Sequence, residues 1–487
     1  MRPRHLLTAL ALSLTLTSPA SAQSAYEQLQ MLTDALNLVR GNYVDSVAYT
    51  QLARAAINGI LRSLDPHSYF ISASDYSLRT GLEAGQHTTV GMTLTEVEGR
   101  ITVLAVRPRG PAERGGIHAG DRLLAVNDMP TAGSRAALVE LILSSPDRER
   151  RTLLLERGAR LNPDTFRITV RTEEQRDVSV TDTRVLADGT GYLRLVQFGP
   201  KAADELQAAL RQLRPQATRG MIIDLRNNPG GLVVAAADIA SLFVPKGTLV
   251  FRTDGRKADA DEEYTAERNG PFQDTPLVLL VDAGTASASE ALAAALQDHR
   301  RATIVGRRTF GKALVQAPFF MKTGDVMWLT IARVYSPAGR MIQRDYRALA
   351  PEAYRTRTAS DSTRGGVLPD VEVPVAELPS WWARAGASGV LHAVADSVAA
   401  TLAESADART AWRDNPADWQ SRLLPPLLAK LPHAAATEPL TDAMKAAAAR
   451  ALAARVAEVR WGADAAIELQ LMADPDIVAG VNALGRT

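Results

Sequence analysis

The sequence contains no cysteine among its 487 residues. This absence excludes disulfides, a thiol nucleophile, thiolate metal sites and lipid attachment through cysteine. An excess of one charge is also missing, since 55 basic residues stand against 54 acidic ones, so electrostatics gives no reason to expect a nucleic-acid partner. Aromatic residues make up only 5% of the chain, whereas hydrophobic residues make up 46%. That hydrophobic content is ordinary for a globular protein, and the length allows two or three domains.

Long hydrophobic runs are missing after the first residues of the chain. Arg2 and Arg4 precede the apolar run LLTALALSLTLT, and ASA at 20–22 fits the small-residue rule for signal cleavage. An N-terminal membrane anchor is the alternative, but the run is short for a bilayer-spanning helix. The pattern therefore predicts a cleaved signal peptide at 1–22, secretion across the cytoplasmic membrane, and a mature chain without a membrane span.

The periodicity of apolar residues divides the rest of the chain. Helical spacing covers 25–64, and short β-runs broken by glycines follow to about Arg171. Apolar strands then alternate with helices, which predicts βαβ units around a largely parallel sheet. After about Glu377 alanine dominates and favours helix. We expect an N-terminal helical region, a β-rich domain, an α/β core and an alanine-rich helical extension, at residues 23–72, 73–172, 173–377 and 378–487.

Ser287 is a candidate nucleophile because it follows the apolar strand PLVLLVD and begins a helix. A sharp strand-to-helix turn can expose a serine hydroxyl and place helix N–H groups beside an oxyanion. The same stretch, Ser287-Ala-Ser-Glu290, also fits a capping box, in which the serine only caps the helix. On this stretch alone, the cap is the favoured interpretation.

Two basic residues after Ser287 are candidates to accept its proton. His299 lies about 18 Å farther along the same helix axis, at the usual rise per residue, which is beyond hydrogen-bond reach. Lys312 follows the next strand, ATIVG, so in a parallel sheet both Ser287 and Lys312 lie beyond the carboxyl ends of adjacent strands. A lysine is a base only when neutral, and its apolar neighbours would favour that form. The alternative is an exposed loop lysine.

A glycine-rich loop, DLRNNPGGL at 224–232, follows another strand and opens another helix. Its glycines free backbone N–H groups to point at an anion. Together with the N–H of Ala288, directly after the serine, such a loop can form an oxyanion hole. The alternative is a plain glycine-rich turn.

Taken together, these stretches resemble the C-terminal processing peptidases, tail-specific serine proteases with a Ser-Lys dyad. The resemblance is carried, in family order between about 64 and 373, by LDPHSYF, PAERGGIHAGDRLLAVN, DLRNNPGGL, TASASEALAAALQDHRRATIVGRRTFGKALVQ, YSPAGRMIQ and GGVLPDVEV. It implies a crotonase/ClpP-like α/β core with the β-rich segment inserted as a PDZ domain. It also implies a periplasmic serine endopeptidase that needs no metal or other cofactor. Two departures are Thr285, where many members have serine, and Ala313, where glycine is frequent.

The family pattern assigns roles to residues at matching positions. The resemblance implies that Ser287 is the nucleophile and Lys312 the general base, with Gln316 orienting the lysine. Gly231 and Ala288 would supply the N–H groups of the oxyanion hole.

The resemblance also implies how substrates are recognised. In the PDZ domain, the N–H groups of Gly91 and Met92 would bind a free apolar C-terminus while the peptide adds as a β-strand. Arg157 is a candidate switch contact between the PDZ domain and the core, with a solvated strand-end arginine as the alternative. Family members also dimerise through their first helices or need a partner, so a homodimer through 25–64 and an adaptor or activator protein are further expectations.

Other functions stay open at this point. The chain can be a latent protease that needs a partner, with the extension from 378 as its docking site. It can also be a non-catalytic PDZ scaffold or a ligand carrier, since the same core fold occurs in retinoid-binding repeats. A carrier, however, has no need of both Ser287 and Lys312. A hydrolase of small esters or amides would leave the PDZ domain unexplained.

Overall fold

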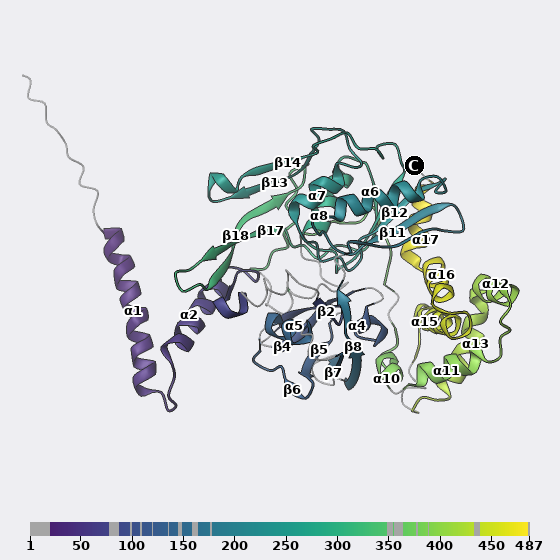
Figure 1. Cartoon of the computed structure of the whole chain (residues 1–487), viewed down its shortest axis with the longest axis horizontal. Coiled ribbons are helices and arrows are strands. Elements are labelled where there is room, and N and C mark those ends of the chain that lie inside the picture. Colours follow the sequence, from purple (N-terminus) through teal and green to yellow (C-terminus); the bar gives the residue numbers. More distant parts are fainter. Residues whose placement is uncertain are drawn as a thin grey trace, which may run out of the picture. The chain divides into compact units, whose positions relative to one another are not determined.

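The structure is a computed structural model. It describes residues 20–76, 87–97, 100–107, 110–118, 120–134, 136–144, 149–157, 164–175, 178–347, 354, 364–375, 378–387, 389–432 and 439–485. All but the last three residues of the predicted signal peptide lie outside these ranges. Within them, none of the helices combines the length and the apolar character that crossing a membrane requires. The chain divides into two units, Met1–Phe70 and Ile71–Thr487, which Figure 1 draws in sequence colours.

The N-terminal unit is helical, as its periodicity predicts. Helix α1 spans Ala20–Asn42 and helix α2 spans Tyr49–Leu64; the short strand β1, Tyr69–Ile71, follows at the boundary between the units. Apolar side chains of α1 such as Leu29 and Leu38 are exposed. The homodimer expected through these helices stays a prediction.

The second unit begins with the β-rich domain. Its strands are β2 His87–Thr89, β3 Met92–Val97, β4 Arg100–Val106, β5 Arg122–Val126, β6 Met129–Pro130, β7 Arg150–Arg157, β8 Asp164–Arg171 and β9 Glu173–Gln175, and its helices are α4 Pro111–Arg114 and α5 Ala136–Ser144. The strands pair antiparallel in the order β3-β4-β5-β7-β8, with β6 on β5, while β2 pairs β9. Ile101, Leu153 and Leu155 are buried at its centre.

A largely parallel sheet forms the core, as the alternation of strands and helices predicts. Its order is β10 Val180–Val185, β11 Thr190–Leu195, β12 Gly220–Asp224, β15 Leu277–Val281, β16 Thr303–Gly306 and β19 Val371–Glu372. All neighbours are parallel except β10, which is antiparallel to β11. Helices α6 Ala202–Leu213, α7 Val233–Ala240 and α8 Ala288–Asp298 pack on one face, against Leu193, Ile223, Leu279 and Ile304.

A second, antiparallel sheet was not predicted from the sequence. Strands β18 Val326–Tyr335, β13 Leu249–Gly255 and β14 Glu262–Thr265 pair in that order, and β17 Leu314–Phe320 pairs β18; a short 3₁₀ helix, Ala258–Ala260, lies between β13 and β14. Strand β17 begins just after Lys312, so this sheet anchors the loop that carries the predicted general base.

The C-terminal extension is helical, as expected. Its helices are α10 Trp382–Ala387, α11 Val390–Ala399, α12 Ala406–Asp414, α13 Pro416–Leu428, α15 Asp442–Trp461, α16 Ala463–Ala473 and α17 Pro475–Leu484. Residues from α10 to α16 enclose an apolar cluster of their own, around Trp412, Trp419 and Leu452. Helix α17 (yellow in Figure 1) instead packs on the core sheet, on the face opposite α6 to α8.

Candidate active site

Ser287 lies in the turn between β15 and α8, in a backbone conformation that is rare for any residue but glycine. Its φ is 59° and its ψ is −119°, whereas an ordinary N-cap residue has extended dihedral angles. Thr285 fixes the turn by donating its hydroxyl hydrogen to the Leu225 carbonyl at 2.8 Å. The capping box expected with Glu290 is present. The strained turn goes beyond what a cap requires and is typical of an exposed nucleophile.

The buried carboxylate of Glu290 joins the turn of Ser287 to the loop of Lys312. Its Oε2 accepts hydrogen bonds from the Ser287 N–H at 2.9 Å and from the Lys312 N–H at 2.8 Å. Its Oε1 accepts from the Gly311 N–H at 2.7 Å and from the Thr309 hydroxyl. The backbone nitrogens of Ser287 and Lys312 therefore lie on the same oxygen atom. The structure brings the two predicted dyad residues together in this way.

Sequence reasoning missed the connecting position of Glu290, because its spacing from Ser287 indicated only a helix cap. The side chain has no measurable exposure. Burial disfavours the charged form and raises the pKa of Glu290 to about 7. The four hydrogen bonds favour the charged form and oppose this rise. A carboxyl group with such a pKa is sensitive to pH in the neutral range.

Lys312 lies half-buried in the loop between β16 and β17. Its sequence neighbours Phe310, Ala313 and Leu314 are buried; that they form an apolar pocket around the amine stays a prediction. The Phe310 N–H donates to the Thr285 carbonyl at 3.0 Å, which ties the lysine loop to the nucleophile turn.

The glycine-rich loop after β12 is joined to the same turn. The Asn228 carbonyl accepts from the Ala286 N–H at 2.9 Å, and the Asn227 N–H donates to the Asp282 carboxylate at 2.9 Å. Gly230 is buried against the turn with a φ of 96°. The three loops that follow β12, β15 and β16 thus form one hydrogen-bonded unit at the carboxyl ends of adjacent strands, where parallel sheets place their sites.

The two N–H groups predicted for the oxyanion hole are available. Among the described residues, neither the Gly231 N–H nor the Ala288 N–H has a protein acceptor. The Gly230 N–H, in contrast, donates to the Asn228 side chain at 2.9 Å. Two free N–H groups beside a strained serine can stabilise the negative charge of a tetrahedral intermediate.

Two other candidates have clear positions. Gln316 lies on β17, and its side-chain amide donates to the Thr330 hydroxyl at 3.5 Å; its orienting role toward Lys312 stays a prediction. His299 ends α8, and its ring forms a hydrogen bond with the Leu249 carbonyl at 2.7 Å. This position agrees with its exclusion as a base.

Within the described ranges, no group of three or more acidic or histidine side chains is placed to hold a metal ion.

In the β-rich domain, one of the two N–H groups predicted to bind a substrate C-terminus is engaged. The Gly91 N–H donates to the Thr89 hydroxyl at 2.9 Å, and the Gly91 carbonyl accepts from the Arg107 N–H at 2.7 Å. Met92 begins β3 and pairs with Val106. An incoming carboxylate must therefore displace the Thr89 hydroxyl from Gly91, a competitor that the sequence did not reveal.

Arg157 is held inside the β-rich domain rather than at a solvated strand end. Its guanidinium donates to the buried carboxylate of Asp121 at 2.6 Å and to the Gly116 carbonyl at 2.7 Å. It also lies over the Phe166 ring, 4.9 Å from the centroid. These contacts give Arg157 a structural role in its own domain, and its role as a switch stays a prediction.

Two family models match the α/β core and the β-rich domain. The model of peptidase family S41 matches residues 189–373, and that of the PDZ domain matches residues 102–157. The carboxy-terminal-processing protease of Bartonella bacilliformis is 33% identical over 325 residues, which cover 66% of this chain and 74% of that protein. The carboxyl-terminal-processing protease of Synechocystis is 32% identical over 341 residues, with coverages of 65% and 79%. A solved structure, the photosystem II D1 C-terminal processing protease, has a TM-score of 0.53 and 30% identity and covers 71% of this chain and 93% of that one.

Proposed function

Since this chain belongs to the carboxy-terminal-processing proteases of peptidase family S41, we propose that it is a secreted serine endopeptidase that recognises substrates by a free apolar C-terminus. Ser287 is the nucleophile and Lys312 the general base. The observation that carries the proposal is the single Glu290 oxygen that accepts both the Ser287 N–H and the Lys312 N–H. A serine that only capped a helix would have no need of a lysine loop held to the same atom.

Acylation uses the groups that this arrangement gathers. The Ser287 hydroxyl gives its proton to the neutral amine of Lys312 as its oxygen attacks the scissile carbonyl carbon. The carbonyl oxygen becomes an oxyanion, which accepts hydrogen bonds from the Gly231 and Ala288 N–H groups. The tetrahedral intermediate then expels the amine, and the lysine ammonium returns the proton to it. The products of this half are a new C-terminal fragment with a free amine and an acyl-enzyme ester on Ser287.

Deacylation repeats the same proton transfers with water. Lys312 takes a proton from a water molecule that attacks the ester carbonyl, and the oxyanion again lies against the two N–H groups. Collapse of the second tetrahedral intermediate releases a carboxylic acid, and Ser287 recovers its proton from Lys312. The side chains supply every proton transfer that the two halves require.

Recognition of the substrate end rests on the PDZ domain. A peptide that adds as a strand beside β3 would bring its carboxylate to the Gly91 and Met92 N–H groups. Only a free C-terminus carries that charge, so an amidated or masked end loses the interaction. An apolar last residue would gain further free energy by leaving water on binding.

The proposal is tested by following cleavage of an unfolded protein with an apolar C-terminus by mass spectrometry. Wild type, Ser287→Ala and Lys312→Ala are compared, with Lys322→Ala as the matched lysine control because Lys322 is exposed in the turn between β17 and β18. We expect cleavage by wild type and Lys322→Ala and loss in both dyad variants. Amidation of the substrate C-terminus should weaken cleavage by the wild type.

Two results would argue against the proposal. Cleavage that persists in Ser287→Ala would assign the activity to another residue or to a contaminant. No cleavage by the folded wild type would favour a latent enzyme or a carrier, and binding of the same substrate to the PDZ domain would then be measured.

A further inference from the structure

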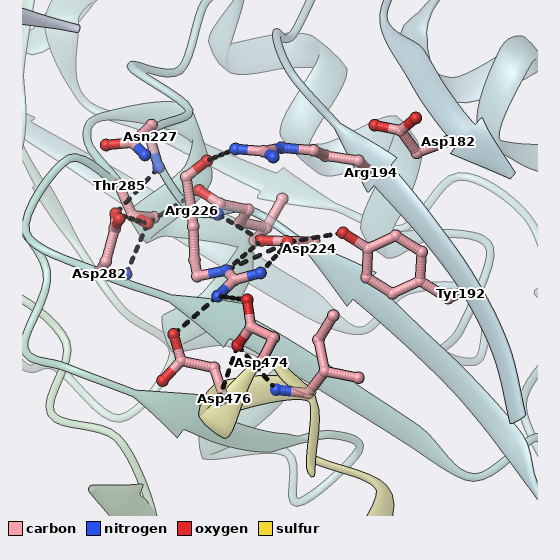
Figure 2. Close-up of polar contacts among 12 residues, drawn as sticks. Asp182, Tyr192, Arg194, Asp224, Arg226, Asn227, Asp282, Thr285, Asp474 and Asp476 are labelled. Atoms are coloured by element: carbon pink, nitrogen blue, oxygen red, sulfur yellow. Dashed lines mark hydrogen bonds and ion pairs between the residues drawn. The ribbon is translucent and has the colours of Figure 1, made fainter. Parts of the chain in front are cut away.

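Helix α17 places two carboxylates against arginines that lie next to the active-site loops. Figure 2 shows the Arg226 guanidinium between Asp224 on one side and Asp474 and Asp476 on the other. Arg226 donates to Asp474 at 2.7 Å and to Asp476 at 2.8 Å. Arg307 donates to both oxygens of the Asp476 carboxylate, at 2.7 and 2.9 Å. Asp476 therefore joins two arginines from different loops.

Each arginine lies five positions before a residue of the proposed machinery. Arg226 follows β12 and leads into the glycine-rich loop that carries Gly231. Arg307 follows β16 and leads into the loop that carries Lys312. The Asp476 side chain is 3% exposed, so solvent does not screen these ion pairs as it screens surface pairs. One carboxylate from the C-terminal extension thus connects the oxyanion loop with the general-base loop.

Apolar packing holds α17 in the position that these ion pairs require. Its residues Ile477, Ala483 and Leu484 are buried in one cluster with residues of the core sheet, including Ile222, Val278 and Leu280. Gly480 faces the sheet so closely that a β-carbon there would lie 3.2 Å from the Ile222 side chain. The helix therefore covers the free face of the sheet, and the position of its N-terminal carboxylates is determined by that packing.

The charges around Arg226 are balanced. Asp224 is fully buried; burial disfavours its charged form, but Arg226 and Arg194 outweigh that effect and keep its pKa below the usual value. The Tyr192 hydroxyl donates to Asp224 at 2.8 Å. Arg226 thus has Asp224, the last residue of β12, as a partner two positions before it. Within the described ranges, Asp476 is the carboxylate that pairs with Arg307.

We infer that Asp476 is a positioning residue, through which the C-terminal extension sets the relative placement of the oxyanion loop and the general-base loop. It contacts neither the dyad nor the oxyanion N–H groups and acts through Arg226 and Arg307. The inference rests on the proposed roles of Gly231 and Lys312. The extension is then part of the peptidase and not only an appendage to it.

The test compares Asp476→Asn with wild type in the full chain. We expect kcat to fall at least tenfold with KM changed less than twofold, because the substrate end is bound elsewhere while the two loops lose their connection. Asp476→Glu keeps the charge and should restore part of kcat. Asp474→Asn keeps a helix-capping side chain and removes a contact to Arg226 alone, so it should lower kcat less than Asp476→Asn.

A second readout does not depend on activity. In the Ser287→Ala background, hydrogen exchange measured by mass spectrometry should rise at 224–232 and 305–316 when Asp476→Asn is added. Asp442→Asn is the matched control, since Asp442 also lies in the first turn of an extension helix but is exposed, and its ion pair among the described residues is with Lys445. It should change neither exchange nor kcat.

The outcomes separate this inference from the proposed function. Unchanged kcat and unchanged exchange in Asp476→Asn would overturn the inference. Equal losses in Asp442→Asn would also overturn it, since they would indicate general destabilisation of the extension. An inactive wild type would contradict the proposed function, while the exchange experiment would still decide whether Asp476 fixes the loops. If Asp476→Asn does not fold, Arg307→Lys replaces it, because lysine keeps the charge but cannot bind both carboxylate oxygens in the same way.

Discussion

Gly230 lies so close to Ser287 that a β-carbon on Gly230 would stand 2.9 Å from the β-carbon of Ser287. The same atom would lie 2.8 Å from the Ala288 nitrogen. The backbone of the glycine loop therefore touches the turn of Ser287 directly, one residue before Gly231. In the proposed oxyanion hole, the approach of the two loops thus depends on Gly230 having no side chain.

Gly230→Ala should abolish most of the activity. The added methyl group must push the loop away from Ser287, and loss of one oxyanion donor alone lowers kcat about a hundredfold or more. Gly247→Ala is the matched control, since Gly247 has a similar positive φ of 82° but no atom within 4 Å of the added carbon. That control should lose only about 1 kcal/mol of stability, from backbone strain, with kcat preserved. Equal kcat values for the two variants would contradict the assigned contact.

Thr309→Val should lower both stability and kcat. The fully buried Thr309 hydroxyl donates to Glu290 and accepts from the Val367 N–H at 2.7 Å. Valine has nearly the same shape but leaves these groups unsatisfied, at a cost of about 1 to 3 kcal/mol. Thr309→Ser keeps the hydroxyl and should retain most of kcat. Chemical denaturation and steady-state kinetics on the three proteins measure both effects, and a Thr309→Val enzyme with wild-type kcat would contradict the role given to Glu290.

Stability should depend on pH through Glu290. Its pKa is about 7 in the folded protein against 4.5 for an ordinary glutamate. Because the folded value is raised, folding favours the protonated form, so this contribution is fully present below pH 4.5 and is lost as the pH rises through 7. The free energy of unfolding of wild type should therefore fall relative to Glu290→Gln, by about 3 kcal/mol across this window.

Urea unfolding of both proteins at several pH values across that window measures the difference, and other titrating groups cancel between them. Parallel stability curves for wild type and Glu290→Gln would show that Glu290 does not titrate there.

Thr89→Ala should strengthen recognition of a free C-terminus. The variant removes the hydroxyl that occupies the Gly91 N–H, so a substrate carboxylate no longer has to displace it. We expect KM to fall about three- to tenfold for a peptide with a free apolar C-terminus, the size of the neutral hydrogen bond that no longer has to be broken. The amidated form of the same peptide should show no change. A similar decrease for both peptides would place the effect outside carboxylate recognition.

The parallel core sheet could be predicted because its strands are buried on both faces. Strand β15, for example, is buried at every position and reads as one continuous apolar run. Strands of the antiparallel sheet, such as β18, mix partly exposed with buried positions and have no regular alternation. Periodicity therefore gave no signal for that sheet. The antiparallel sheet is recognised only in the structure, where β13 and β17 both pair with β18.

That Ser287 and Lys312 lie in neighbouring loops could be predicted, because they follow the adjacent parallel strands β15 and β16. The bridging role of Glu290 could not, since a glutamate at this spacing from a serine fits any helix start. The sequence around Asp476 indicated even less about the role inferred for that residue. It lies in an ordinary helix start, with Asp474 as the N-cap and Pro475 next to it, and its arginine partners are 250 and 169 positions away.

That separation has a consequence for the order in which the protein forms. A chain that emerges with its N-terminus first folds from its N-terminal parts onward, so the residues of the core sheet, with Ser287 and Lys312, emerge before α17 does. The ion pair between Arg226 and Asp476 joins residues 250 positions apart in the sequence. Contacts between residues so far apart in the sequence form slowly. The loops around the dyad therefore become fixed late in folding, after the intervening helices are in place. With the roles proposed for Ser287 and Lys312, a newly made chain would contain its nucleophile and base before it could use them efficiently, and cleavage of its own unfolded segments would be limited.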